Sequence, residues 1–140
     1  MRSREQVIRD FVQQWIGKAE LDIETAKILL DAAMEDYYPC AFHCQQAAEK
    51  FLKAYLVRHQ IEFRKTHDLG ELLRLVGSVD TVLASALASC EWLTPYGVEF
   101  RYPGECPEVD RRTAEKAFRE AEAVKRRIME KLEDYLSSEI

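Results

Sequence analysis

The chain has 140 residues, of which 47% are hydrophobic and 32% charged, with only 5 glycines and 4 prolines. This length and composition predict one soluble domain, spanning residues 1–140, with a hydrophobic core of its own. The net charge of −5 argues against a protein that coats nucleic acid through excess positive charge. No apolar run is long enough to span a membrane, and the charged first residues are unlike a signal peptide, so we expect a cytoplasmic location.

Hydrophobic residues recur every three or four positions from Gln6 to Glu35, which predicts a long first helix. Tyr38-Pro39 interrupts this pattern, and proline suits the first turn of a new helix. A second helix is predicted from Pro39 to His59. It is apolar on more than one side, which is typical of a central helix. Its polar strip is narrow and consists of His43, Gln46, Lys50 and Lys53, with Gln45 and Glu49 beside it.

Three further helices are predicted, from Asp68 to Gly77, Val79 to Leu93 and Arg111 to Leu136. Asp68 and Glu71 have the spacing of a capping box at the start of the third helix. The segment from Thr94 to Asp110 has no helical period, and a loop of this length is usually functional or disordered. Together these elements predict an all-α fold, an up-and-down antiparallel bundle of about five helices similar to a four-helix bundle.

The pattern predicts a polar core or interface position for four residues, Asp22, Gln45, Gln46 and Glu49. Asp22 lies on the apolar line of the first helix, so it either pairs with a lysine of the second helix or lies at an exposed edge. Glu49 and Lys53 have the spacing of a surface ion pair. Gln45 and Gln46 lie on the most apolar helix, where amides need hydrogen-bond partners in the interior, in another subunit or in a ligand.

The segment Lys65-Thr66-His67-Asp68-Leu69 precedes the third helix. Free N–H groups at a helix start can hold a phosphate, and Lys65 and His67 would add donors. The alternative is structural, with Thr66 or Asp68 capping the helix and His67 packed nearby. The four cysteines, at positions 40, 44, 90 and 106, lack zinc-ligand spacing. We expect them to be free thiols, and we predict no metal and no cofactor.

Four blocks of the sequence occur in the order found in a known family. They are Ala19-Glu20-Leu21-Asp22 with the apolar residues that follow, CAFHCQQAAEKFLKAYL from Cys40 to Leu56, KTHDLGELL from Lys65 to Leu73, and RYP from Arg101 to Pro103. In these blocks the chain resembles the HEPN (higher eukaryotes and prokaryotes nucleotide-binding) family. The resemblance implies a helical bundle that forms homodimers with a cleft near the subunit interface. It also implies a prokaryotic cytoplasmic protein, often paired with a minimal nucleotidyltransferase in a toxin–antitoxin system.

Some members of the family are metal-independent ribonucleases, which carry an arginine followed four to six residues later by a histidine. No arginine precedes His43, His59 or His67 at this spacing, and Arg101 has no histidine at this spacing after it. The sequence therefore favours binding over catalysis, although His67 and Arg101 remain candidates for a degenerate ribonuclease site. A structural dimer that stabilises a partner chain is a further alternative.

The residues that we expect to bind a nucleotide or RNA phosphate are cationic or polar side chains of strips and loops. A local cluster of positive charge can attract anions even when the net charge is negative. We also expect a homodimer, because the second helix has more apolar surface than a small bundle needs to cover. The candidate ligand-binding residues are Lys50, Lys53, Lys65, Thr66, His67, Arg101 and Tyr102.

Overall fold

The computed structural model describes residues 1–99, 102 and 104–139, and this part of the chain is helical, without a β-strand. The elements are α1 (Arg4–Asp31), α2 (Tyr38–Arg58), α3 (Leu69–Gly77), α4 (Thr81–Leu87), a 3₁₀ helix η1 (Ala88–Gly97) and α5 (Arg111–Ser137). The prediction of an all-α fold with about five helices is confirmed. None of the described helices is long and apolar enough to cross a membrane.

The helix boundaries follow local capping chemistry. Ser3 caps α1 in a capping box with Gln6, and α1 ends at Asp31, four residues before the predicted Glu35, because Ala32 is extended. The predicted fourth helix differs in kind: α4 ends at Leu87, and the chain continues as the 3₁₀ helix η1 through Pro95. Such segments often extend the end of an α-helix, so the start of the predicted loop is also helical.

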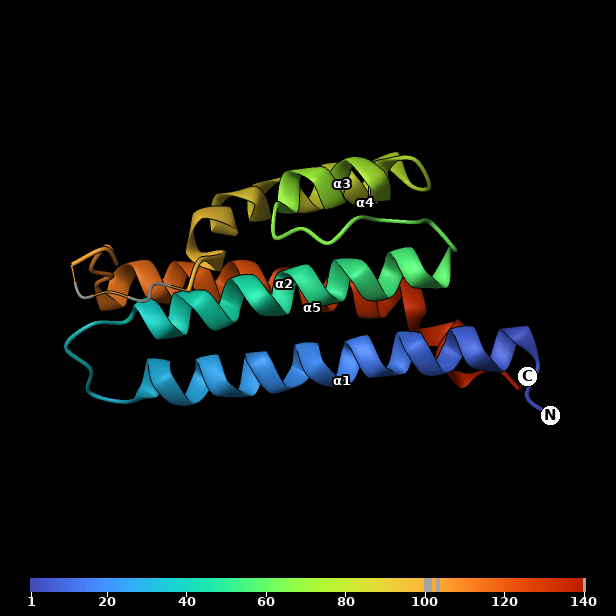
Figure 1. Ribbon diagram of the computed structural model, residues 1–140, viewed down its shortest axis with the longest axis horizontal. Coiled ribbons are helices and arrows are strands. Elements are labelled where there is room, and N and C mark those ends of the chain that lie inside the picture. The colour runs from blue at the N-terminus through green and yellow to red at the C-terminus, as the bar shows by residue number, and fades with distance from the viewer. Residues whose placement is uncertain (100–101, 103, 140) are drawn as a thin grey trace.

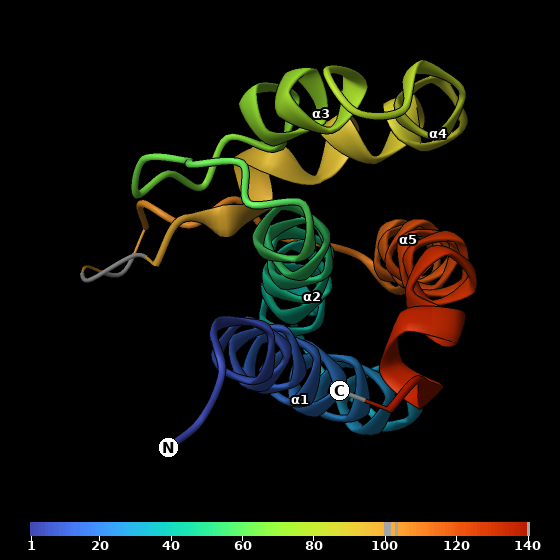
Figure 2. The ribbon, with the colours of Figure 1, turned by 90° about the vertical axis from the view of Figure 1, so that its right-hand side faces the viewer.

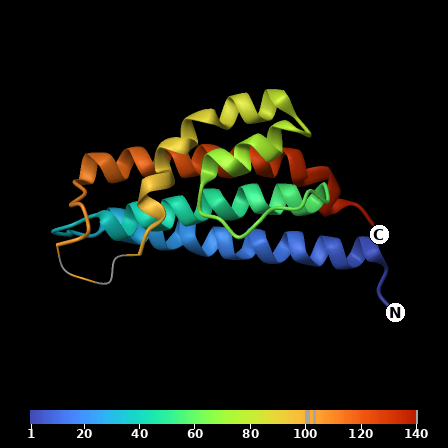
Figure 3. The same ribbon diagram turned by 45° about the horizontal axis from the view of Figure 1, so that its top comes forward.

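The long helix α2 lies at the centre of the molecule, between α1 on one side and the layer formed by α3, α4 and η1 on the other (Figures 1 and 2). The third long helix, α5, packs along α2 and also contacts α1. Figure 3, turned forward by 45°, shows α3, α4 and η1 lying over α2 and α5. The broad apolar surface of α2 therefore contacts four elements of its own chain.

The direction of α5 departs from a strict up-and-down order. Helices α1 and α2 are antiparallel, but α5 runs in the same direction as α2 (Figure 1). The reason is the excursion through α3, α4 and η1, which returns the chain to the end of the molecule where α2 begins. The three long helices form a bundle, seen end-on in Figure 2, and the two short helices with η1 cover one side of it.

The apolar surplus on α2, from which we expected a second copy to cover the helix, is covered by the chain itself. Phe51, Leu52 and Leu56 are fully buried by neighbouring elements of the same chain. That argument for a dimer is therefore wrong. Large apolar side chains are exposed instead on α1, where Phe11, Leu21 and Ile28 have exposed fractions of 52%, 61% and 70%.

Candidate functional site

The polar residues of α2 form a cluster around an ion pair inside the protein. Glu49 and Lys53 lie one turn apart on α2, both buried, with 2.9 Å between Lys53 Nζ and Glu49 Oε2. Lys53 also donates to the carbonyl of Thr66 over 3.1 Å, and its ammonium lies over the rings of Trp15 and Phe63. The pair itself was predicted, but its predicted position on the surface is wrong, because the segment between α2 and α3 covers this side of α2.

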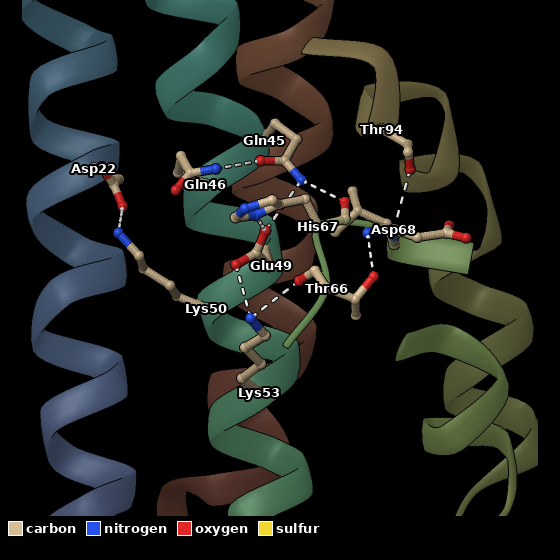
Figure 4. Close-up of polar contacts among 11 residues, drawn as sticks. Asp22, Gln45, Gln46, Glu49, Lys50, Lys53, Thr66, His67, Asp68 and Thr94 are labelled. Atoms are coloured by element: carbon tan, nitrogen blue, oxygen red, sulfur yellow. Dashed lines mark hydrogen bonds and ion pairs between the residues drawn. The ribbon is translucent and has the colours of Figure 1, made fainter. Parts of the chain in front are cut away.

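His67 contacts this buried ion pair and is also exposed to solvent. Its Nδ1 lies 2.7 Å from Glu49 Oε1, while 60% of its side chain remains exposed. One buried carboxylate thus binds an ammonium through one oxygen and an imidazole through the other (Figure 4). A carboxylate on Nδ1 fixes the orientation of the ring and leaves Nε2 available to a ligand.

Gln45 and Gln46 extend the same network along α2. Gln45 is fully buried, and its Nε2 donates to the carbonyl of His67 over 2.9 Å and to Glu49 Oε1 over 3.4 Å. Gln46 is half-buried, and its Nε2 donates to Gln45 Oε1 over 2.7 Å (Figure 4). Both amides therefore have partners within the chain, as buried amides require.

A second carboxylate-centred cluster lies on the α1 side of α2. Asp22 binds Lys50 Nζ through Oδ2 over 2.5 Å and His43 Nδ1 through Oδ1 over 2.9 Å. Burial alone would raise the pKa of Asp22, but hydrogen bonds from His43 and Lys50 outweigh it and hold the pKa below its usual value. Asp22 was predicted either to pair with a lysine of the second helix or to lie at an exposed edge, and the structure contains the lysine pair. His43 was not predicted as a partner of Asp22, although it stands two turns before Lys50 on the same strip.

The start of α3 is closed to a phosphate by the side chains of the chain itself. Asp68 Oδ1 accepts from the N–H groups of Gly70 and Glu71, and Thr94 Oγ1 accepts from that of Leu69. The N–H groups expected to hold an anion are thus already engaged. Of the structural alternatives, Asp68 is the cap. Glu71 does not complete the predicted capping box, since it pairs with Arg64 instead.

A pocket of about 620 Å³ opens beside this network, between α2, the start of α3 and the end of η1. Gly97 allows η1 to pack closely here, because a Cβ at this position would lie 2.6 Å from Cδ of Gln45. The pocket lining combines one ring, one amide, one imidazole and two carboxylates with smaller groups. These residues are Phe42, Gln46, His67, Asp68, Thr94, Gly97, Val98 and Glu99.

The other candidate residues are distributed around this pocket rather than in it. Lys53 and Thr66 are buried beneath the segment that carries His67, and Lys50 lies on the α1 side with Asp22. Lys65 is exposed, and Tyr102 is 67% exposed. Arg101 lies outside the described residues. The lining residues Phe42, Thr94 and Glu99 were not predicted, since none of them belongs to a recognisable polar pattern.

The described residues form no group of three or more histidine, cysteine or carboxylate side chains that could hold a metal ion. Cys40, Cys44 and Cys90 are buried free thiols, and burial raises the pKa of Cys90 to about 12. The described residues offer two histidines on carboxylates, His67 at the pocket and His43 in the cluster of Asp22, and the amide of Gln46 at the pocket.

Comparison with known proteins shows the family to which this chain belongs. The HEPN domain family model matches residues 12–132, and the chain belongs to this family. It is 31% identical over 142 residues to a protein of Methanocaldococcus jannaschii named "Putative toxin MJ1304", with 90% of this chain and 88% of that protein covered. It is also similar to the crystal structure of TT1696 from Thermus thermophilus, with a TM-score of 0.63, 28% identity, and 86% and 98% of the two chains covered.

Proposed function

We propose that this chain is a toxin–antitoxin-related HEPN protein that binds a nucleotide, or one nucleotide unit of RNA, in the pocket beside α2. The observation that carries the proposal is the pocket of about 620 Å³. His67 and Gln46 reach it from a buried hydrogen-bond network, which holds them in place before a ligand arrives. The similarity to a protein named as a toxin supports the class.

The charges around the pocket suit a ligand with an anionic end. Lys53 neutralises Glu49 beneath the pocket, so the buried carboxylate does not repel an approaching phosphate strongly. Lys65 is exposed two residues before His67, on the segment that precedes α3. In this proposal the phosphate stays at the rim with Lys65 and His67, and the rest of the nucleotide enters the pocket.

Binding of a fluorescein-labelled short RNA, followed by fluorescence anisotropy, tests the proposal. The variant His67→Ala removes one hydrogen bond to a charged group, worth about 1.5 to 3 kcal/mol, so the Kd should rise about tenfold or more. His59→Ala is the matched control, because His59 lies at the other end of α2. Equal affinity of wild type and His67→Ala, or no binding at millimolar protein, contradicts the proposal.

A second candidate function is metal-independent cleavage of RNA, and one observation favours it. Both His43 and His67 hold a largely buried carboxylate on Nδ1, which leaves Nε2 of each ring for proton transfer. In such a reaction one imidazole accepts the proton of the ribose 2′-hydroxyl as the O2′–P bond forms. The other donates a proton to the 5′-oxygen as the P–O5′ bond breaks, giving a 2′,3′-cyclic phosphate. The absent arginine–histidine motif keeps this candidate second.

The cleavage candidate is tested with total RNA in the presence of EDTA, comparing wild type with His43→Gln, His67→Gln and Arg101→Ala. Loss of cleavage in the histidine variants supports it, and the Arg101 variant reports whether that side chain takes part. Cleavage that survives all three substitutions points to a contaminating nuclease, and its absence from the wild type removes this candidate.

We further propose that the protein acts as a homodimer and pairs with a minimal nucleotidyltransferase. Leu21 and Ile28 support a protein interface on α1, because they are exposed and separated by close to two helical turns, which places them on one face. Phe11, also exposed, lies about 80° around the helix from Leu21. Light scattering at micromolar concentration tests the dimer, and Leu21→Glu should give the monomer. Purification from the native host tests the partner. A dimer without a partner and without RNA binding would leave a purely structural role.

A further inference from the structure

The orientation of the Gln45 amide is set by its acceptors. Its Nε2 faces the carbonyl of His67 and Oε1 of Glu49, both of which can only accept while Glu49 is ionised. The oxygen of the Gln45 amide must therefore point the other way, toward Gln46. This assignment comes from the network, which is how an amide orientation is determined when hydrogens are not observed.

The orientation of Gln46 follows from that of Gln45. Gln46 must turn its NH₂ group toward Gln45 Oε1, and the two atoms lie 2.7 Å apart. One N–H of Gln46 then remains, and within the described residues its Oε1 accepts no hydrogen bond. Gln46 lines the pocket, and its amide carries this donor and this acceptor side by side.

The rest of the pocket lining is rich in acceptors. Asp68 and Glu99 contribute carboxylates, and Asp68 uses Oδ1 to cap α3. Among the described residues of the lining, His67 is the one side chain that can carry positive charge. A phosphate inside the pocket would face two carboxylates, whereas a group that bears N–H donors would be favoured there.

We propose that the pocket is a nucleobase subsite that prefers adenine, an inference that rests on the nucleotide binding proposed above. Gln46 Oε1 accepts from the adenine 6-amino group, and Gln46 Nε2 donates to N7, the pairing by which glutamine reads adenine elsewhere. The second amino hydrogen points to a carboxylate of the lining, and the ring of Phe42 contacts the base. Guanine presents two acceptors, O6 and N7, at this edge and leaves Gln46 Oε1 facing an acceptor. Uracil has no amino group.

The experiment measures the Kd of AMP, CMP, GMP and UMP by isothermal titration calorimetry at pH 7, for wild type and for Gln46→Leu. Leucine has similar size but neither donor nor acceptor. Wild type should bind AMP about five- to tenfold more tightly than GMP or UMP, with CMP between them. Gln46→Leu should bind all four with equal, weaker affinity. Gln14→Leu, an exposed change on α1, is the matched control and should keep the preference for AMP.

Two results overturn the inference in distinguishable ways. Equal binding of the four nucleotides by wild type, or a preference for AMP that survives in Gln46→Leu, removes the adenine subsite and leaves nucleotide binding intact. Failure of the wild type to bind any of the four at millimolar concentration removes the subsite, and it removes the proposed function as well when the labelled RNA also fails to bind. Unfolding curves for Gln46→Leu and Gln14→Leu must match, so that loss of binding reports the side chain and not the fold.

Discussion

The buried pair of Glu49 and Lys53 makes a strong and specific prediction about stability. Glu49→Leu leaves the Lys53 ammonium inside the protein with the Thr66 carbonyl and the aromatic rings beside it but without a countercharge. Breaking a buried ion pair in this way costs about 3 to 5 kcal/mol. A domain of this size has a free energy of unfolding of about 5 to 15 kcal/mol, so the variant should lose a large share of it.

The double variant Glu49→Leu/Lys53→Met separates the charge effect from packing. Apolar side chains of similar volume can replace a buried ion pair at little cost, so the double variant should be more stable than Glu49→Leu alone. Some cost remains, because Gln45 and the Thr66 carbonyl also lose partners. We expect a coupling energy between the two substitutions of about 2 kcal/mol.

Urea unfolding followed by circular dichroism measures these free energies. The matched control is the exposed pair of Lys27 and Asp31, which has the same spacing on α1 and 56% and 57% exposed side chains. Lys27→Met and Asp31→Leu should each change the free energy of unfolding by less than about 1 kcal/mol. A loss of under about 1 kcal/mol for Glu49→Leu, or a double variant that loses the full sum of both singles, refutes the reasoning.

Three further substitutions test two separate features of the structure. The pKa of Asp22 lies below its ordinary value of 3.8, so the carboxylate stabilises the fold fully at pH values above 3.8, and this contribution falls as the pH drops through the lower native pKa. The free energy of unfolding of Asp22→Asn should therefore fall below that of wild type at pH 7, and the difference should shrink at pH 3. A difference independent of pH contradicts the pairing. Gly97→Ala places a Cβ against Gln45 and should cost about 1 to 3 kcal/mol, whereas Gly17→Ala, in open space within α1, should stabilise by about 0.5 to 1 kcal/mol. Thermal melts of both variants check this contrast.

Helix periodicity and the cost of burying a charge were enough to predict much of the fold and part of the site. The apolar pattern predicted α1, α2 and α5 to within a few residues, because each helix buries one or more continuous faces. The place of Asp22 on such a face predicted either a lysine partner from α2 or an exposed edge position, and the structure contains the first, with Lys50 as the partner. These inferences succeed because the relevant neighbours lie on regular elements.

The parts that sequence reasoning missed depend on irregular segments. Glu49 and Lys53 are buried because the chain between α2 and α3 folds over them, and that segment has no period from which its path could be predicted. The cap that Thr94 gives to the N–H of Leu69 joins residues 25 apart in the sequence. The pocket depends on both contacts, so its lining could not be derived from local spacing.

The stretch that carries His67 is fastened to α2 by side chains. Lys53 donates a hydrogen bond to the carbonyl of Thr66, and Gln45 donates one to the carbonyl of His67. Two neighbouring peptide groups of this segment are therefore held by side chains of α2. The orientation of the His67 imidazole therefore depends on residues that do not contact a ligand in the pocket. We expect substitutions at positions 45 and 53 to change the affinity of the pocket for its ligand without touching the ligand. Homologues that differ at these positions should hold the same histidine at a different angle.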